Sequence, residues 1–157
     1  MDSRVKISKP RPLTPEDDLT RFDCGAPGLD HWLKERALRS ERNHDARTYV
    51  VTAGERAVVG FYCLSAAVVE RESASGWLSR NAPDPVPVIL IGRLAVDRRL
   101  QRSGLGAALL ADAARRARTA AEHVGARAIV VDAPDQISVG FYQRFGFTRL
   151  SATSTRL

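Results

Sequence analysis

The sequence has few lysines, few cysteines and no long apolar segment, and each shortage excludes a class of protein. Only Lys6, Lys9 and Lys34 are lysines among the 24 basic residues, so arginine carries nearly all of the positive charge. The 2 cysteines lack the spacing of a metal site or of a C-x-x-C redox pair. The longest uncharged stretch, residues 57–69, is shorter than the roughly 20 residues of a membrane-spanning helix. With no apolar export signal behind the N-terminus, a cytoplasmic protein without disulfide, metal or membrane span is expected.

The length and composition predict a single globular domain over residues 1–157. Of the 157 residues, 44% are hydrophobic and 27% charged, and the net charge is +6. Two explanations of the arginine excess remain open. The planar guanidinium group suits bidentate binding of phosphate, which indicates an anionic partner, whereas the base composition of a genome can produce the same bias. Charge alone therefore names no partner.

The apolar pattern predicts an α/β fold in which helices flank one mixed central sheet. Continuous apolar runs are typical of buried strands, and apolar residues three and four apart are typical of helices. In the first half of the chain, the expected elements are an edge strand near residues 5–8, a helix over 29–42, a hairpin over 47–52 and 57–69, and a short helix near Trp77. A buried strand over 88–96 and a long helix over 105–122 are expected next. The remaining elements expected are a strand over 128–131, a helix over 137–145, and strands over 147–150 and in the final residues. This order is typical of a sheet covered by helices.

The residues between the buried strand and the long helix carry the strongest chemical signal. Here the chain reads Gln101-Arg102-Ser103-Gly104-Leu105-Gly106-Ala107. The first turn of a helix has unpaired backbone N–H groups and the positive end of the helix dipole, so it can bind a phosphate. Gly104 and Gly106 lack the Cβ atoms that would hold an anion away from the backbone. A phosphate-binding loop is therefore expected at this junction.

Two common phosphate-binding loops do not fit this segment. A Walker loop requires Lys after its last glycine, and no Lys follows Gly106. A dinucleotide-binding loop requires a third glycine, and Leu109 stands in its place. Arg98, Arg99 and Arg102 are expected to supply positive charge around the phosphate that binds here.

The spacing of the loop is that of a different family. Gln101-x-x-Gly104-x-Gly106, preceded by the run Gly92-Arg93-Leu94-Ala95-Val96-Asp97, resembles motif A of the GCN5-related N-acetyltransferase (GNAT) family. The run Phe141-Tyr142-Gln143-Arg144-Phe145-Gly146-Phe147 resembles motif B of that family. The resemblance implies a GNAT fold with acetyl-CoA as co-substrate, its pyrophosphate in the loop and its pantetheine arm beside the strand. The coenzyme-binding residues that it implies are Leu94, Ala95, Val96, Gln101, Arg102, Ser103, Gly104, Leu105, Gly106 and Ala107.

A closer resemblance covers residues 22–150, which look like the acetyltransferase toxins of type II toxin–antitoxin systems. The segments 22–25, 29–33 and 47–51 carry it together with the two motifs. It implies acetylation of the α-amino group of aminoacyl-tRNA, which blocks translation, by a homodimer that a small ribbon-helix-helix antitoxin neutralises. Two alternatives stay open: an acetyltransferase for a small amine, a polyamine or a protein N-terminus, and a non-enzymatic basic module that joins an antitoxin on DNA.

Direct acetyl transfer needs a neutral amine and a proton for the departing thiolate. The resemblance assigns the proton to Tyr142, whose phenol is protonated at neutral pH; the alternative is a core tyrosine between Phe141 and Phe145. No general base is predicted, because an α-amine next to an ester is largely neutral at physiological pH. His31 and His44 are interpreted as ordinary surface or half-buried histidines.

Three further arginines are candidate substrate contacts. Arg93 lies in an apolar strand, where an unpaired charge is costly, so it should meet a carboxylate or a phosphate near the site or emerge at a sheet edge. Arg36 and Arg39 lie on the first predicted helix, where they either contact tRNA phosphates or form a solvated face. Asp135 stands where many GNAT proteins have Asn, and it is expected to cap the following helix equally well.

Overall fold

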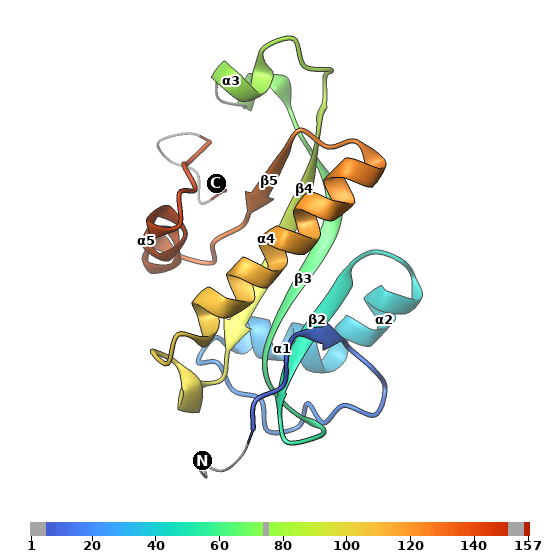
Figure 1. The fold of residues 1–157 in the computed structure, drawn as a ribbon, viewed down its shortest axis with the longest axis vertical. Coiled ribbons are helices and arrows are strands. Elements are labelled where there is room, and N and C mark those ends of the chain that lie inside the picture. The colour runs from blue at the N-terminus through green and yellow to red at the C-terminus, as the bar shows by residue number, and fades with distance from the viewer. Residues whose placement is uncertain (1–5, 74–75, 151–155) are drawn as a thin grey trace. The chain divides into compact units, whose positions relative to one another are not determined.

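The structure is a computed structural model that describes residues 6–73, 76–150 and 156–157. Its elements in chain order are β1 (Arg11–Pro12), α1 (Pro27–Glu35), α2 (Ala37–Arg42), β2 (Arg47–Ala53), β3 (Ala57–Val69), η1 (Arg71–Ser73), α3 (Gly76–Ser79), β4 (Val86–Val96), η2 (Arg98–Leu100), α4 (Leu105–Val124), β5 (Ala128–Val131) and α5 (Gln136–Arg144). The strands form a 5-stranded sheet in the order β1-β2-β3-β4-β5. β1, β2 and β3 pair antiparallel, whereas β4 and β5 pair parallel. The predicted α/β fold with a mixed sheet and flanking helices is confirmed (Figure 1).

The chain divides into two compact units. The first holds the described residues of Met1–Leu64 and Arg93–Ala113, and the second holds those of Ser65–Gly92 and Ala114–Leu157. β3, β4 and α4 each run from one unit into the other. The single domain over residues 1–157 stays a prediction.

In the first unit, α1 and α2 cover one face of the strands with an aromatic core. Trp32 of α1 stacks on Phe61 of β3 at a ring distance of 6.1 Å, and Phe22 meets the same ring edge-on at 5.5 Å. Leu33 and Ala95 belong to the same buried cluster. Because Ala95 lies on β4, this core holds the end of that strand in place.

The opposite face of the first unit packs against the start of α4 at Gly60. A Cβ at Gly60 would lie 2.9 Å from Cγ2 of Val51 and 3.1 Å from Cδ1 of Leu109, which belongs to α4. Both neighbours are buried side chains. The glycine is therefore required for the helix to lie this close to the strands.

The second unit is built on the parallel pair of β4 and β5, whose register runs from Val88 opposite Ala128 to Ile91 opposite Val131. α5 follows, and Asp135 caps it by accepting a hydrogen bond from the Ser138 N–H at 2.7 Å. This confirms the cap expected from the sequence. The hairpin, the helix near Trp77, the long helix and the strand at 128–131 are also confirmed, within two residues at most boundaries.

Three predicted elements were wrong in part. The helix predicted over 29–42 is broken at Arg36 into α1 and α2, because Arg36 has a φ of −124°, outside the helical range. The edge strand lies at Arg11–Pro12, while Ile7 forms only an isolated bridge. Residues 147–150 form no strand in the part of the chain that is described: the chain turns at Gly146, with φ +95°, and the Phe147 N–H donates back to the Tyr142 carbonyl at 3.3 Å. Residue 5 and residues 151–155 lie outside the described residues.

Candidate functional site

The strand-to-helix junction forms a short, tightly turned loop. β4 ends at Val96, a single 3-10 turn covers Arg98–Leu100, and α4 begins at Leu105. Gly104 has φ +89° and Arg102 has φ +65°, both in the left-handed region that disfavours side chains with a Cβ. The Ser103 hydroxyl donates to the Leu100 carbonyl, which closes the turn.

The start of α4 offers backbone donors to an anion. The first helix-type bond runs from the Ala108 N–H to the Gly104 carbonyl at 3.1 Å. The N–H groups of Leu105, Gly106 and Ala107 precede that bond, and such first-turn groups have no partner within a helix. A Cβ at Gly104 would meet nothing within 4 Å, so the space beside the loop is open. These residues fit a pyrophosphate group.

The side chain of Asp97 anchors the loop between β4 and α4. The residue is buried at 1% exposure, and its Oδ1 accepts hydrogen bonds from Nε of Arg99 at 2.9 Å and from the Arg99 N–H at 3.0 Å. Its Oδ2 accepts from Nη2 of Arg99 at 3.1 Å and from the Asp23 N–H at 3.2 Å. Burial alone would raise the pKa of the Asp97 carboxyl, but the hydrogen bonds and charge of Arg99, with the Asp23 N–H, outweigh it and lower the pKa.

Gln101, an expected coenzyme residue, uses its amide within the protein. Nε2 donates to the Cys24 carbonyl at 2.8 Å and to the Val96 carbonyl at 2.9 Å. Beside it, the Arg98 N–H donates to the Asp23 carbonyl at 2.8 Å. The loop is therefore fixed to the segment that precedes α1.

The three arginines that were expected around the phosphate differ in their partners. Arg99 forms a bidentate ion pair with Asp97, and Nε of Arg98 lies 3.6 Å from Oδ1 of Asp23. Arg102 is exposed, and its side chain forms no ion pair within the described residues. Arg102 is thus the arginine of this group whose charge is open to a ligand.

Arg93 meets an aromatic ring, a partner that the sequence analysis did not foresee. Its Cζ lies 4.2 Å from the centre of the Trp32 ring, a cation–π contact. Arg93 is half-buried, whereas Arg36 and Arg39 are exposed. All three belong to the first unit, as do the coenzyme candidates of β4 and the loop.

Tyr142 belongs to the second unit, where it lies on α5 at 3% exposure. The ring of Phe141 lies 5.2 Å from it and that of Phe147 lies 5.9 Å away, both edge-on. Local packing thus fixes the orientation of the phenol.

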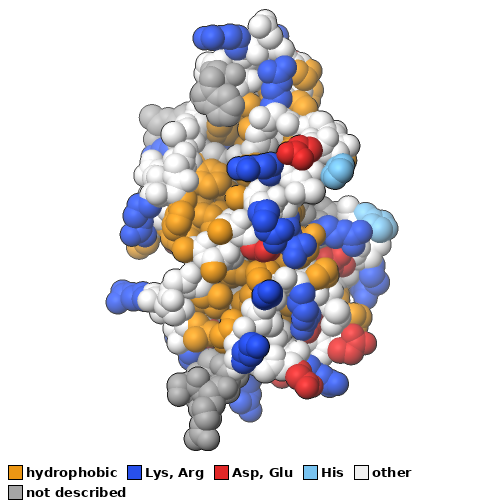
Figure 2. All heavy atoms as spheres, in the orientation of Figure 1, with side chains coloured by type: hydrophobic (Ala, Val, Ile, Leu, Met, Phe, Trp, Pro, Cys, Tyr) orange, Lys and Arg blue, Asp and Glu red, His pale blue; other side chains and the backbone are white. Residues whose placement is uncertain are grey.

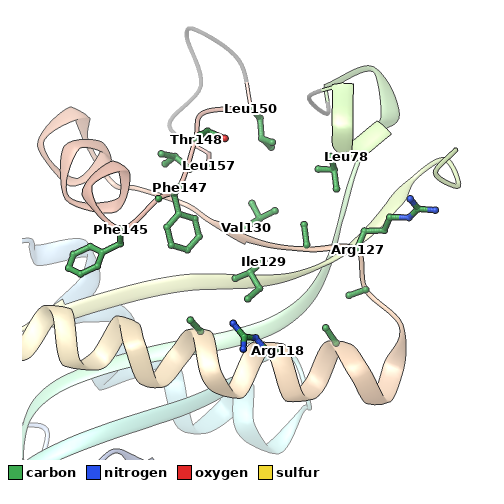
Figure 3. A pocket seen from close by; sticks show the side chains of 15 residues that line it. Leu78, Arg118, Arg127, Ile129, Val130, Phe145, Phe147, Thr148, Leu150 and Leu157 are labelled. Carbon is green, nitrogen blue, oxygen red and sulfur yellow. The ribbon is translucent and has the colours of Figure 1, made fainter. Parts of the chain in front are cut away.

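A cavity of about 520 Å³ lies in the second unit, between α4, β5 and the segment that follows α5 (Figure 3). Its lining is mostly apolar and includes Phe147 and Ile129. Arg118 of α4 lines it, whereas Arg127 reaches away to the Asn81 carbonyl at 2.9 Å. On the face drawn in Figure 2, Lys and Arg side chains are more numerous than Asp and Glu side chains.

The structure shows three features that sequence reasoning missed. These are the Trp32 ring beneath Arg93, the anchoring role of Asp97 and the hydrogen bond from the buried Tyr62 hydroxyl to Asp112. Of these three features, only the anchoring role of Asp97 had a signal in the sequence, the Asp-x-Arg spacing directly after β4.

Burial raises the pKa of the Cys24 thiol to about 11, so this thiol is protonated at neutral pH and is a poor nucleophile.

Metal and membrane features were searched within the described residues. There, no group of His, Cys, Asp and Glu side chains is placed to hold a metal ion. No helix in the same ranges is both long and apolar enough to cross a membrane.

Comparison with known proteins places these features in context. Residues 16–147 match the acetyltransferase (GNAT) family. The chain is 46% identical over 140 residues to a tRNA-acetylating toxin of Mycobacterium tuberculosis, which covers 89% of this chain and 84% of that protein.

Solved structures agree with that match. AtaT complexed with acetyl-methionyl-tRNAfMet is 30% identical, with a TM-score of 0.87 over 97% of this chain and 93% of that one. A Tyr-to-Phe mutant of AtaT, bound to the C-terminus of the antitoxin AtaR and acetyl-CoA, is 31% identical, with a TM-score of 0.80 over 96% and 91% of the two chains.

Proposed function

Because the chain belongs to the acetyltransferase (GNAT) family, we propose that it acetylates the α-amino group of aminoacyl-tRNA and thereby acts as a toxin that blocks translation. As a family member it is an N-acetyltransferase that uses acetyl-CoA. The observation that carries the choice of substrate is the 46% identity to a tRNA-acetylating toxin. The complex of AtaT with an acetylated aminoacyl-tRNA supports the same choice.

The loop before α4 is the proposed binding site of the coenzyme pyrophosphate. The N–H groups of Leu105, Gly106 and Ala107 would hold the phosphate oxygens, and Arg102 would add an exposed charge. β4 would offer the backbone of residues 94–96 to the pantetheine arm. Acetyl-CoA supplies the activated thioester, and the protein supplies its orientation.

Tyr142 is the proposed general acid. The α-amine attacks the thioester carbonyl and forms the C–N bond, the C–S bond breaks, and the Tyr142 hydroxyl gives its proton to the departing thiolate, while water takes the proton that the amine nitrogen loses. The amine needs no enzymatic base, because much of it is neutral at physiological pH. The aromatic packing around Tyr142 supports a role that depends on a fixed phenol.

The acceptor side is proposed to bind tRNA through arginine. The guanidinium group of Arg93 lies over the Trp32 ring, and its N–H groups would bind a phosphate. The exposed side chains of Arg36 and Arg39 extend the same helical region. Binding of arginine side chains to the phosphate backbone of tRNA weakens as the salt concentration rises.

The test is mass analysis of a mixture of aminoacyl-tRNAs, a polyamine and a protein with a free N-terminus after incubation with acetyl-CoA and the acetyltransferase. We expect acetyl groups on the α-amine of one or more aminoacyl-tRNAs, and Tyr142→Phe should bind acetyl-CoA normally while losing most turnover. Acetylated polyamine or protein N-termini with unmodified tRNA would favour the alternative acceptors. Full turnover by Tyr142→Phe would remove its assigned role.

The proposed partners follow from the same comparison. AtaT was solved with the C-terminus of the antitoxin AtaR, and we propose a ribbon-helix-helix antitoxin and a homodimeric toxin in the cytoplasm, where aminoacyl-tRNA is used. Co-expression with any small ribbon-helix-helix protein that is found encoded next to it, followed by light scattering of the purified complex, tests both. A monomer that the neighbouring protein leaves active would contradict the proposal.

A further inference from the structure

The segment Asp23–Ala26, named here the α1 leader, is bonded directly to the coenzyme loop. The Asp23 N–H donates to Asp97, the Asp23 carbonyl accepts from the Arg98 N–H, and the Cys24 carbonyl accepts from Gln101. A Cβ on Gly25 would lie 3.4 Å from Nε of Arg98, so the two segments are also in close contact. All of these residues belong to the first unit.

Gln101 occupies the junction of three chain segments. Its Nε2 carries two hydrogens, and each has an acceptor: the Cys24 carbonyl on the α1 leader and the Val96 carbonyl at the end of β4. The same residue begins the turn that leads to Gly104. With both hydrogens used, this nitrogen has no donor left for a phosphate.

The loop that Gln101 begins needs such an anchor. Arg102 has φ +65°, a left-handed conformation that costs a residue with a Cβ free energy and persists only where the surroundings enforce it. On the other side of the loop, Gly104 has φ +89°. Binding a pyrophosphate through the following N–H groups requires that these turns be formed in advance.

We propose that Gln101 is a positioning residue for acetyl-CoA: its amide fastens the loop to the α1 leader and to β4, and it does not bind the coenzyme itself. The inference rests on the proposed coenzyme site. By joining the loop to the α1 leader, Gln101 also links coenzyme binding to α1, the helix that carries Trp32 beneath Arg93.

The test compares hydrogen exchange in the protein without ligand and acetyl-CoA affinity by calorimetry. Gln101→Met keeps the length of the side chain and removes both donors. We expect faster exchange in residues 23–26 and 98–101 of the free protein, whose backbone N–H groups are hydrogen-bonded around the junction, and acetyl-CoA affinity reduced roughly 10- to 30-fold, the loss that two ordinary hydrogen bonds would give. Gln143→Met, the same change at an exposed position on α5, should leave exchange in both segments as in the wild type.

A second variant separates anchoring from misfolding. Gln101→Arg keeps several N–H donors and should retain most of the exchange protection that Gln101→Met loses. Weaker acetyl-CoA binding with unchanged exchange in the free protein would mean that Gln101 contacts the coenzyme, which overturns the proposal. Acetyl-CoA affinity and hydrogen exchange that are both unchanged in Gln101→Met would also overturn the proposal. Failure of the wild type to bind acetyl-CoA would instead overturn the proposed function, and the positioning role with it.

Discussion

Replacing Asp97 with Asn should destabilise the protein, because the side chain is buried and both of its oxygens are used as acceptors. Oδ1 and Oδ2 together accept from the side chain of Arg99 and from the N–H groups of Arg99 and Asp23. Asparagine keeps one oxygen and puts an NH₂ group in place of the other. In either orientation of the amide, this NH₂ group therefore faces N–H donors that the carboxylate oxygen had accepted.

The magnitude follows from the bonds that are lost. A hydrogen bond to a charged group contributes about 1.5–3 kcal/mol, and removing one partner of a fully buried ion pair costs about 3–5 kcal/mol. The Arg99 side chain is 46% exposed, so water takes over part of its solvation. We therefore expect Asp97→Asn to lower the free energy of unfolding by about 2–3 kcal/mol.

Urea unfolding followed by tryptophan fluorescence measures this change. Asp45→Asn is the matched control, since Asp45 is exposed, and it should change the free energy of unfolding by less than about 0.5 kcal/mol. If Asp97→Asn were as stable as that control, the ion pair with Arg99 would not hold the loop.

The same pair predicts how stability varies with pH. The pKa of the Asp97 carboxyl is lowered in the folded protein, so its contribution is complete above the unfolded pKa of about 3.9 and is lost as the pH falls through the folded pKa. The difference in unfolding free energy between wild type and Asp97→Asn should be constant from neutral pH down to about pH 5 and should narrow below about pH 4. A difference that narrows near neutral pH would point to another group.

Three further substitutions test the fold and the site. Gly60→Ala should cost about 1–3 kcal/mol of stability in thermal unfolding, because its Cβ meets Cγ2 of Val51 at 2.9 Å; Val51→Ala in the same chain should restore part of it, and no recovery would locate the strain elsewhere. Gly104→Ala should weaken acetyl-CoA binding in calorimetry through backbone strain of about 1–2 kcal/mol, since its φ is +89° and its Cβ meets no atom. Arg93→Lys keeps the charge but loses the guanidinium contact with Trp32 and the forked N–H donors, so tRNA affinity in filter binding should fall while acetyl-CoA affinity holds; a fall in both affinities would mean that Arg93 has a structural role.

The sequence predicts the central elements well, because their signals are local. β5 is found at the expected residues, 128–131, and the long helix begins at the expected Leu105. Continuous apolar runs and an Ala- and Leu-rich repeat leave few other structures for these segments. The break at Arg36 has no such signal, because the apolar positions continue from Trp32 to Ala37 as if the helix were unbroken.

The parts of the site that sequence reasoning missed depend on residues far apart in the chain. Gln101 bonds to a carbonyl 77 positions earlier, and Tyr62 bonds to Asp112, 50 positions later. Periodicity and motif spacing describe neighbours within a few residues, so neither partner could be read from them. The motif located the loop, but only the fold shows that its first side chain faces the protein.

The affinities for the two proposed anionic ligands, acetyl-CoA and tRNA, should depend differently on salt concentration. Asp97 and Asp23 already pair with Arg99 and Arg98, so the coenzyme loop depends mainly on backbone N–H groups, with Arg102 as the exposed charge. Short hydrogen bonds from fixed dipoles are less screened by ions than the contacts of exposed arginines with tRNA phosphates. Titration with KCl should therefore give a steep logarithmic loss of tRNA affinity and a shallow loss of acetyl-CoA affinity. Equal slopes would mean that mobile charge, rather than the preformed turn at α4, binds the coenzyme.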